Sequence, residues 1–180
     1  MPYVAIGIGV VVLWVAYSYN RFVVLRARVH NAWSQIEVQL RMRHDLIPNI
    51  VATVQGYAAH EKGLFAQVAE ARSRAMGMST VAGREEAESA LSGALRSLFA
   101  VAEAYPVLRA SENFTNLQQQ LQDVEKRLAY TRQFYNDTVL RYNTRLQVFP
   151  SNLLAAIFHL TPESYFQAGQ ESQSPVEVKF

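Results

Sequence analysis

The chain has 180 residues, of which 50% are hydrophobic and 18% are charged, so it has room for one domain of ordinary size and a short appendage. Eight glycines and six prolines are too few for a collagen-like or linker-like chain, and the lack of cysteine excludes disulfides, thiol nucleophiles and cysteine-based metal sites. Because 17 Lys and Arg face 15 Asp and Glu, the net charge is only +2, and we expect no nucleic-acid partner.

The first 20 residues are expected to be a membrane anchor. Residues 2–20 carry no charged side chain. Seventeen to nineteen residues, nearly all apolar and rising about 1.5 Å each, reach roughly 26–28 Å, which just spans a hydrocarbon core of about 30 Å. Aromatic side chains lie near both ends of the run, as they do at membrane surfaces: Tyr3, Trp14, Tyr17 and Tyr19.

Two other interpretations of this segment are weaker. A cleaved signal peptide should begin with basic side chains, and Ala16-Tyr17-Ser18 is a poor cleavage triplet. A buried core helix should keep a polar stripe, and none is present. Arg21, Arg26 and Arg28 follow the run directly, so the positive-inside bias predicts that the remainder of the chain lies in the cytoplasm.

A three–four spacing of apolar residues predicts one long amphipathic helix over residues 22–75. Arg43 and Glu61 interrupt the apolar stripe with charge. Pro48 lies within it, where a kink or a break is expected, and the continuity of the stripe favours a kink. At about 55 residues this helix would reach roughly 80 Å and form the spine of the fold.

Shorter helices are predicted after a break at residues 77–83. An acidic first turn, Glu85, Glu86 and Glu88, starts the second helix, which Pro106 ends near Tyr105. Ser111 is a suitable N-cap for the third, whose heptad-like seam predicts coiled-coil-like packing up to Pro150. Residues 152–160 predict a last short helix.

The expected fold class is therefore all-α, an N-terminal transmembrane helix followed by an elongated antiparallel up-and-down bundle. The predicted divisions are an anchor at residues 1–20, a helical bundle domain at 21–160, and an extended or partly ordered tail at 161–180.

The sequence shows no catalytic or metal-binding motif. The four histidines (His30, His44, His60 and His159) are dispersed and lack the Glu-x-x-His or His-Glu-x-x-His spacing of metal sites, so solvated or capping roles are the simpler interpretation. Neither a glycine-rich phosphate loop nor a Gly-x-Ser-x-Gly elbow occurs. We therefore predict a protein that is not an enzyme and has no metal or other cofactor.

Seven residues are candidates for interaction with a partner: Trp33, Arg41, Arg43, Tyr135, Asn136, Tyr142 and Asn143. The two arginines, beside His44, would form a small basic patch for lipid headgroups or a protein, although a solvated helix face is the simpler interpretation. The two Tyr-Asn pairs are seven residues apart and share a helix face, so they are either core packing or a docking stripe. Trp33 is a candidate core anchor rather than a ligand cage.

Taken together, the anchor and a series of short motifs resemble the LemA family of bacterial membrane proteins over nearly the whole chain. The motifs, in order, are Asn31-Ala32-Trp33-Ser34-Gln35-Ile36, Val38-Gln39-Leu40, Asp45-Leu46-Ile47-Pro48-Asn49, Gly56-Tyr57-Ala58-Ala59-His60-Glu61, Ala71-Arg72, Tyr105-Pro106, Glu112-Asn113-Phe114, Tyr135-Asn136, Tyr142-Asn143 and Phe149-Pro150. The chain departs from the expected pattern at Phe158-His159-Leu160, where Phe-Gly-aromatic is expected, and at His44, where an aromatic residue is commoner.

The resemblance implies an antiparallel bundle on a single membrane anchor, in the bacterial inner membrane, and it brings no accepted enzymatic activity. Family members resemble scaffolding or accessory proteins. Some are linked with membrane metallopeptidases of the HtpX type, and one relative takes part in building magnetosome membranes. No catalytic role is transferred to any residue of this chain.

The leading hypothesis is a membrane-anchored scaffold or accessory protein that acts through protein–protein contacts. Its expected partners are the lipid bilayer, further copies of itself, and a membrane metallopeptidase or other membrane protein. The alternative is a self-assembling ring or cage that shapes or organises the membrane, and particle size in mild detergent separates the two.

Overall fold

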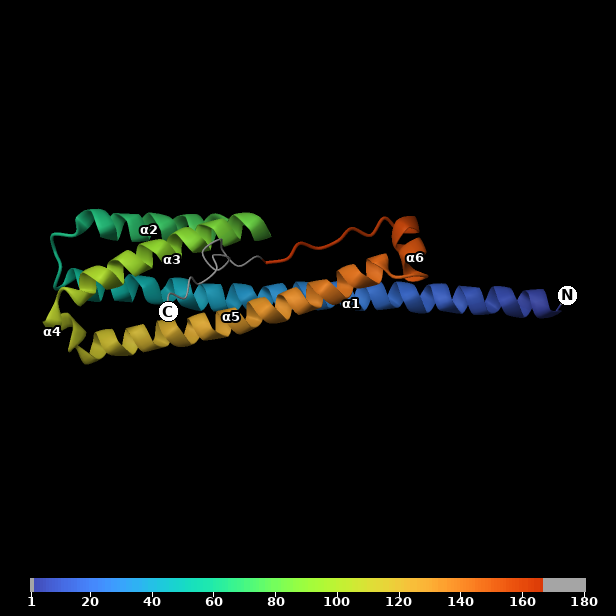
Figure 1. Cartoon of the computed structure of the whole chain (residues 1–180), viewed down its shortest axis with the longest axis horizontal. Coiled ribbons are helices and arrows are strands. Elements are labelled where there is room, and N and C mark those ends of the chain that lie inside the picture. The colour runs from blue at the N-terminus through green and yellow to red at the C-terminus, as the bar shows by residue number, and fades with distance from the viewer. Residues whose placement is uncertain (1, 167–180) are drawn as a thin grey trace, which may run out of the picture. The chain divides into compact units, whose positions relative to one another are not determined.

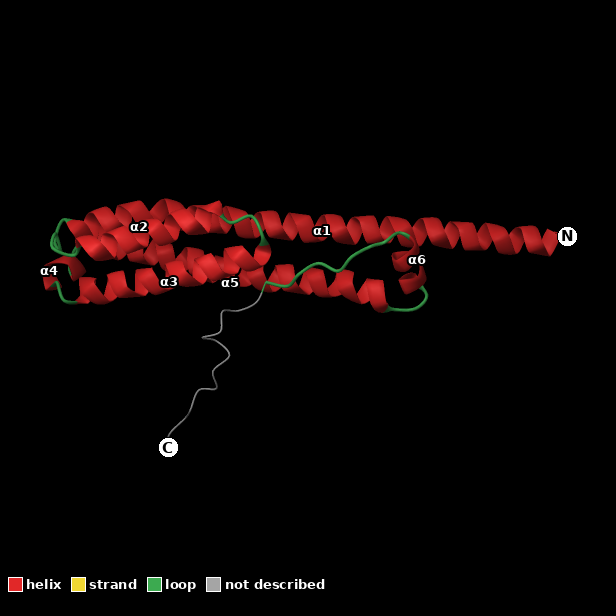
Figure 2. Ribbon diagram, turned by 90° about the horizontal axis from the view of Figure 1, so that it is seen from above, coloured by secondary structure: helices red, strands yellow, loops and turns green. Residues whose placement is uncertain are grey.

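The computed structural model describes residues 2–166, and within that range the chain forms helices and connecting turns with no strand (Figures 1 and 2). The elements are α1 (Pro2–Gln55), α2 (Lys62–Gly77), α3 (Val81–Glu103), α4 (Pro106–Arg109), α5 (Glu112–Gln147) and α6 (Ser151–Ile157). The predicted all-α class is confirmed. Of the predicted tail, residues 161–166 are non-helical, and residues 167–180 lie outside the described range.

The first long helix is shorter at its carboxyl end than predicted. It continues through Pro48 without a break, and then ends at Gln55, so the predicted helix over 22–75 is wrong beyond that residue. At the end the backbone tightens, because the Tyr57 amide donates to the Val54 carbonyl at 3.0 Å, three residues back. After a turn over residues 56–61, α2 begins at Lys62.

Burial explains the break, which local pattern alone did not show. The stripe of α1 and the stripe of α2 belong to one core cluster, in which Ile47, Ile50 and Val54 join Phe65 and Val68. An unbroken helix would carry the second stripe away from this cluster and leave it in water. Folding back removes these side chains from water at a gain of about 1.5–3 kcal/mol each.

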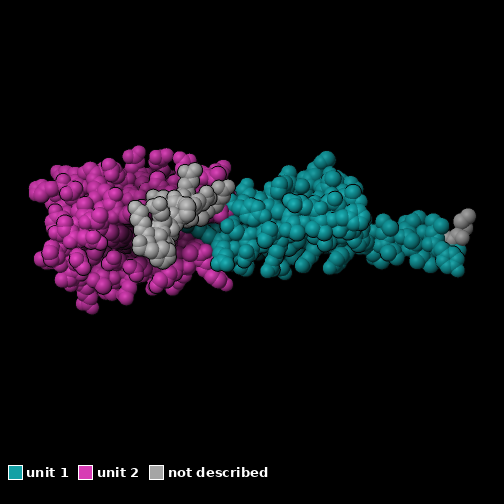
Figure 3. Space-filling view, in the orientation of Figure 1, with its two compact units in different colours: residues 1–36, 131–165 teal, residues 37–130, 166–180 magenta. Residues whose placement is uncertain are grey.

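Contacts divide the chain into two compact units, coloured separately in Figure 3. Unit 1 comprises residues 1–36 and 131–165, and unit 2 comprises residues 37–130 and 166–180. Both α1 and α5 supply residues to each unit.

Unit 2 is a four-helix arrangement. The last part of α1, then α2, α3 and the first part of α5 run in alternating directions, joined by short turns (Figure 1). Thr80 caps α3 by accepting a hydrogen bond from the Gly83 amide at 3.2 Å, and Pro106 begins α4. Within this unit the chain therefore has the predicted antiparallel up-and-down course.

Unit 1 holds the amino end of α1, the carboxyl end of α5, α6 and the non-helical segment that follows it. Its buried apolar side chains come from all three helices: Phe22, Leu25, Val29, Ala32, Ile36, Tyr135, Val139, Tyr142, Leu154 and Ala155. The large apolar side chains from Tyr3 to Leu13, in contrast, are all exposed. Among the described helices, only α1 is long and apolar enough to cross a membrane, which fits the predicted anchor.

Candidate functional site

Unit 2 contains a group of charged and polar side chains, which we call the Arg43 cluster: the buried Arg43, His44 and Glu88, and the partly exposed Ser92 and Glu125. The Arg43 guanidinium donates from Nη1 to Glu88 Oε2 at 2.6 Å and from Nη2 to Ser92 Oγ at 2.8 Å. Its Nε lies 2.6 Å from Glu125 Oε1, an ion pair. His44 Nε2 donates to the second Glu88 oxygen at 2.7 Å.

Three helices meet at this cluster. Arg43 and His44 are adjacent on α1, while Glu88 and Ser92 lie one turn apart on α3 and Glu125 comes from α5. Ser92 Oγ also donates to the Glu88 carbonyl at 2.9 Å, which holds the hydroxyl in place as an acceptor for Arg43. Arg72 on α2 donates from Nε to the His44 carbonyl at 2.8 Å, so the four long helices of the unit are joined by polar contacts.

The cluster holds Glu88 in its charged form. Burial by itself raises the pKa of this carboxyl, but the hydrogen bond from His44 and the charge of Arg43 outweigh it, and the pKa is lowered from its ordinary 4.5. Ion pairs this deeply buried gain little net stability over apolar packing. Loss of one partner is costly, however, because it leaves a charge without compensation, so the cluster fixes which helix faces meet.

Arg43 and His44 lie in the interior, not on the solvated surface that the simpler sequence interpretation gave them. Arg43 is 2% exposed and His44 is 4% exposed, so the simpler interpretation of a solvated helix face, and of a solvated or capping histidine, is wrong for both. Glu88 was interpreted only as part of an acidic first turn. Its spacing of three and seven residues from the buried Leu91 and Leu95 is the signal that places it on the apolar face.

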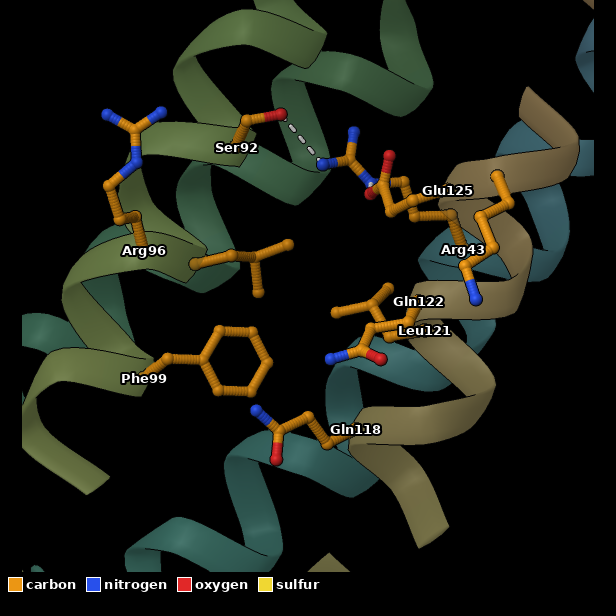
Figure 4. Close-up of a pocket in the computed structure, with 10 residues that line it drawn as sticks. Arg43, Ser92, Arg96, Phe99, Gln118, Leu121, Gln122 and Glu125 are labelled. Atoms are coloured by element: carbon orange, nitrogen blue, oxygen red, sulfur yellow. Dashed lines mark hydrogen bonds and ion pairs between the residues drawn. The ribbon is translucent and has the colours of Figure 1, made fainter. Parts of the chain in front are cut away.

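A groove of about 560 Å³ opens beside the cluster, between α3 and α5 (Figure 4). Its apolar lining residues are Leu95, Phe99 and Leu121, and Figure 4 shows Arg43 and Ser92 together at one end. Polar and charged side chains line the rest: Arg96, Gln118, Gln122, Glu125 and Lys126. The close-up shows the Phe99 ring directed from α3 into the space that faces α5.

In unit 1, the predicted Tyr-Asn stripe binds the chain's own non-helical segment, residues 161–164. The Tyr135 hydroxyl donates to the Ser164 carbonyl at 2.8 Å, and the Tyr142 hydroxyl donates to the Thr161 carbonyl at 3.1 Å. Asn143 pairs with the backbone of Glu163 at both ends of its amide, donating from Nδ2 at 2.9 Å and accepting at Oδ1 at 3.0 Å. The segment is a strap along α5.

Both tyrosine hydroxyls remain protonated donors. Burial raises the pKa of Tyr135, and the nearby Glu163 charge adds to the effect. Burial also raises the pKa of Tyr142, where Arg26 acts in the opposite direction and Glu163 in the same one. Of the two interpretations of the stripe, core packing is the one that the geometry shows, since Tyr135, Tyr142 and Asn143 are buried.

The other three candidate residues lie nearer the surface. Trp33 is half-buried, and its ring lies 5.5 Å from that of Tyr135, centroid to centroid. Asn136 is half-buried as well, whereas Arg41 is exposed beside a small cavity of about 210 Å³. Binding of a partner by any of the seven residues stays a prediction. The residues that the structure describes contain no group of three or more His, Asp or Glu placed to hold a metal ion.

The chain matches a known protein family over most of its length. The model of the LemA family matches residues 32–180, which includes all of unit 2 and the strap of unit 1. The chain belongs to the LemA family. The sequence resemblance is thereby confirmed, and so is the membership that its motifs implied.

Curated relatives of this LemA-family chain include two proteins of Paramagnetospirillum magneticum, magnetosome proteins MamQ 1 and MamQ 2. Each is 26% identical to it over 88% of this chain and 68% of the relative. Magnetosome protein MamQ of Magnetospirillum gryphiswaldense is 24% identical over the same shares. With the exposed apolar part of α1, these relationships support a membrane-associated protein.

Proposed function

We propose that this protein is a membrane-anchored scaffold or accessory protein that acts by protein–protein contact and catalyses no reaction itself. The observation that carries the proposal is the continuity of α1. One helix extends from an exposed apolar segment, which suits a lipid environment, into the bundle whose helices the Arg43 cluster joins. The bundle is thereby tethered to the bilayer, where its surfaces meet other membrane proteins.

We place the protein in the bacterial inner membrane as a single-pass protein with its bundle in the cytoplasm, since Arg21, Arg26 and Arg28 follow the apolar segment. Its partners would be other membrane proteins, a membrane metallopeptidase among them, or further copies of the chain. In sealed inverted vesicles the cytoplasmic face of the membrane is on the outside, so external protease should digest the bundle. Digestion only after the vesicles are opened would contradict this orientation.

Crosslinking in intact membranes tests the scaffold role. A photo-crosslinking residue in place of exposed Arg41 should yield a reproducible adduct with another membrane protein or a second copy. A probe in place of buried Ile36, which faces the core of its own unit, is the matched control and should yield none. Recovery of the protein alone from several exposed positions would defeat the proposal.

Self-assembly into a ring or cage is the second candidate. It is favoured by Val38 and Met42, two large apolar side chains that lie one helical turn apart on α1 and are both exposed. Two of the relatives are named as magnetosome proteins of one organism, and assembly on a membrane would suit such a setting. Large closed particles in mild detergent that Val38→Glu dissociates would favour this function, and a monomer or dimer would exclude it.

A further inference from the structure

The corner between α5 and α6 has an unusual composition for a surface element. No Asp, Glu, Lys or Arg occurs over residues 146–162, a stretch comparable in length to the uncharged anchor segment. Within it the structure exposes large apolar side chains: Phe149 at 75%, Ile157 at 66%, Leu153 at 55% and Phe158 at 43%. We call residues 148–160 the α6 corner. Such a patch marks a surface that meets something other than water.

The α6 corner lies against the anchor, because the Phe158 and Tyr19 rings are in contact with their centroids 4.9 Å apart. Phe158 and the anchor also enclose an apolar notch of about 460 Å³, lined on the α1 side by Val11, Val12, Val15, Ala16 and Tyr19. Ser18, between two exposed tyrosines, is completely buried. The two uncharged segments of the chain are therefore neighbours in unit 1.

The length of the free anchor fixes how deep the corner must lie. The run in which every residue is exposed extends over residues 2–13, and Trp14 and Val15 are already half-buried. Twelve residues of helix rise only about 18 Å, whereas a hydrocarbon core measures about 30 Å. If α1 spans the bilayer, as the proposed function requires, the hydrocarbon must continue along residues 14–20, and the corner lies beside those residues.

The backbone of the corner suits that position. The Leu160 amide donates to the Ala155 carbonyl at 2.9 Å and the His159 amide to the Ala156 carbonyl at 3.2 Å, which closes the carboxyl end of α6. The Ser151 hydroxyl lies 2.8 Å from the carbonyls of Arg145 and Val148, at the end of α5. These polar groups have partners within the chain, as a low-dielectric surrounding favours, whereas the buried Asn152 Oδ1 and the buried Ser18 hydroxyl have no hydrogen-bond partner among the described residues.

We propose that the α6 corner is a second membrane contact, immersed in the boundary of the bilayer beside the anchor, with Phe149, Leu153, Ile157 and Phe158 facing lipid. The occupant of this apolar face is thus the bilayer itself, because the face is continuous with the segment that spans it. Two contacts instead of one restrain α1 from pivoting where it leaves the membrane.

Single-cysteine variants test the proposal cleanly, because the natural chain has no cysteine. A polarity-sensitive fluorophore is attached at Leu153→Cys or Ile157→Cys in the full chain reconstituted in phosphatidylcholine and phosphatidylglycerol vesicles. Quenching by a nitroxide carried on the lipid acyl chain is then measured. Val10→Cys reports the anchor, and Tyr130→Cys, exposed at 71% on α5 in unit 2, serves as the aqueous control.

We expect quenching at Leu153 and Ile157 that approaches the value at Val10 and exceeds the value at Tyr130 several-fold. If Val10 is quenched but Leu153 and Ile157 match Tyr130, the inference is overturned and the anchor stands. If Val10 also fails to respond, the membrane anchor itself is disproved, and the inference falls with it. Labels at the corner that are shielded from lipid, together with disulfide-linked dimers of Leu153→Cys, would show that a second copy covers the face and would overturn the proposal.

Discussion

Glu88 accepts hydrogen bonds from Arg43 on one carboxylate oxygen and from His44 on the other, at 2.6 and 2.7 Å. It is 2% exposed, so water cannot replace either partner. The energetic importance of such a residue lies in what its absence leaves behind. Without Glu88, Arg43 keeps Glu125 but remains buried with less compensation, and His44 loses its acceptor.

Glu88→Gln should lower the free energy of unfolding by about 3 kcal/mol, the lower end of the cost of breaking a buried ion pair, because Glu125 still faces Arg43. Denaturant unfolding monitored by circular dichroism in detergent micelles measures the change. Exposed Glu86, on the same helix, is the matched control, and Glu86→Gln should shift stability by less than about 0.5 kcal/mol. Equal effects of the two substitutions would contradict the role of the cluster.

The same residue predicts a loss of stability in acid. Because the pKa of Glu88 is lowered from its ordinary 4.5 in the folded state, its stabilising contribution is present above that ordinary value. The contribution is lost as pH falls through the folded-state pKa, where the carboxylate is protonated. The free energy of unfolding, measured from pH 7 to pH 2, should therefore fall more steeply for the natural protein than for Glu88→Gln. An equal pH dependence of the two proteins would exclude the linkage.

His159 occupies a backbone position that suits glycine, with φ of 50° at the end of α6. A side chain at left-handed φ costs roughly 1–2 kcal/mol, and glycine is the usual residue after a helix end of this type. His159→Gly should therefore raise the free energy of unfolding by about 1 kcal/mol. His159→Ala retains Cβ and should give no comparable gain, so an equal gain from both would contradict the backbone explanation.

At the scale of elements, two connecting segments determine which parts of the chain pack together. The turn over residues 56–61 separates α1 from α2 and lets both stripes enter one core cluster. The strap over residues 161–164 has no regular secondary structure, so its carbonyl groups depend on side chains of α5. Arg26 adds an ion pair to Glu163 at 3.4 Å, but its half-exposed side chain makes this contact worth at most about 1 kcal/mol.

Asn143→Ala should release the strap while α5 stays intact. The substitution removes both hydrogen bonds to Glu163, at a cost of about 1–3 kcal/mol. Amide hydrogen exchange checks this directly. The Glu163 N–H donates a hydrogen bond to Asn143 Oδ1 in the natural protein, so it should exchange at least about tenfold faster in the variant. Asn116→Ala, at an exposed position of α5, is the control and should leave the exchange of Glu163 unchanged.

At the scale of the whole molecule, one helix serves two environments. Its exposed apolar beginning is suited to lipid, and its later residues supply core side chains to unit 1 and then to unit 2. Membrane attachment should therefore be separable from folding. The first charged side chain of α1 is Arg21, so charges placed earlier act on the anchor.

Ile8→Lys combined with Val12→Lys should move the protein from the membrane fraction to the soluble fraction or to aggregates. Each lysine near the centre of a span costs about 2.5–3.5 kcal/mol, and neither natural side chain belongs to a core. Alkaline extraction followed by immunoblotting measures the distribution. Val23→Lys with Val24→Lys, which also replaces exposed apolar residues but follows Arg21, is the control and should remain in the membrane fraction.

Much of the fold was predictable because its signals are local. The uncharged run at residues 2–20, the three–four spacing, and the prolines and glycines at helix ends each act through neighbouring residues, and they predicted all-α structure and most boundaries. The candidate site was less predictable. Spacing singled out Tyr135, Tyr142 and Asn143 as candidates. Their hydrogen-bond acceptors lie about 20–30 residues further along the chain, so no local sequence pattern indicates them.

The sequence by itself determined that the protein is helical and that its first residues suit a membrane, because composition and periodicity act over one or two helical turns. Its motifs resemble those of the LemA family, and the match to the family model over residues 32–180 shows the membership. Only the tertiary structure decided that the chain turns back after Gln55, that Arg43 and His44 are buried on Glu88, and that the Tyr-Asn stripe holds a strap. Those outcomes depend on pairing charged groups and apolar faces that are distant along the chain. The free energy of such pairing exists only once the helices pack.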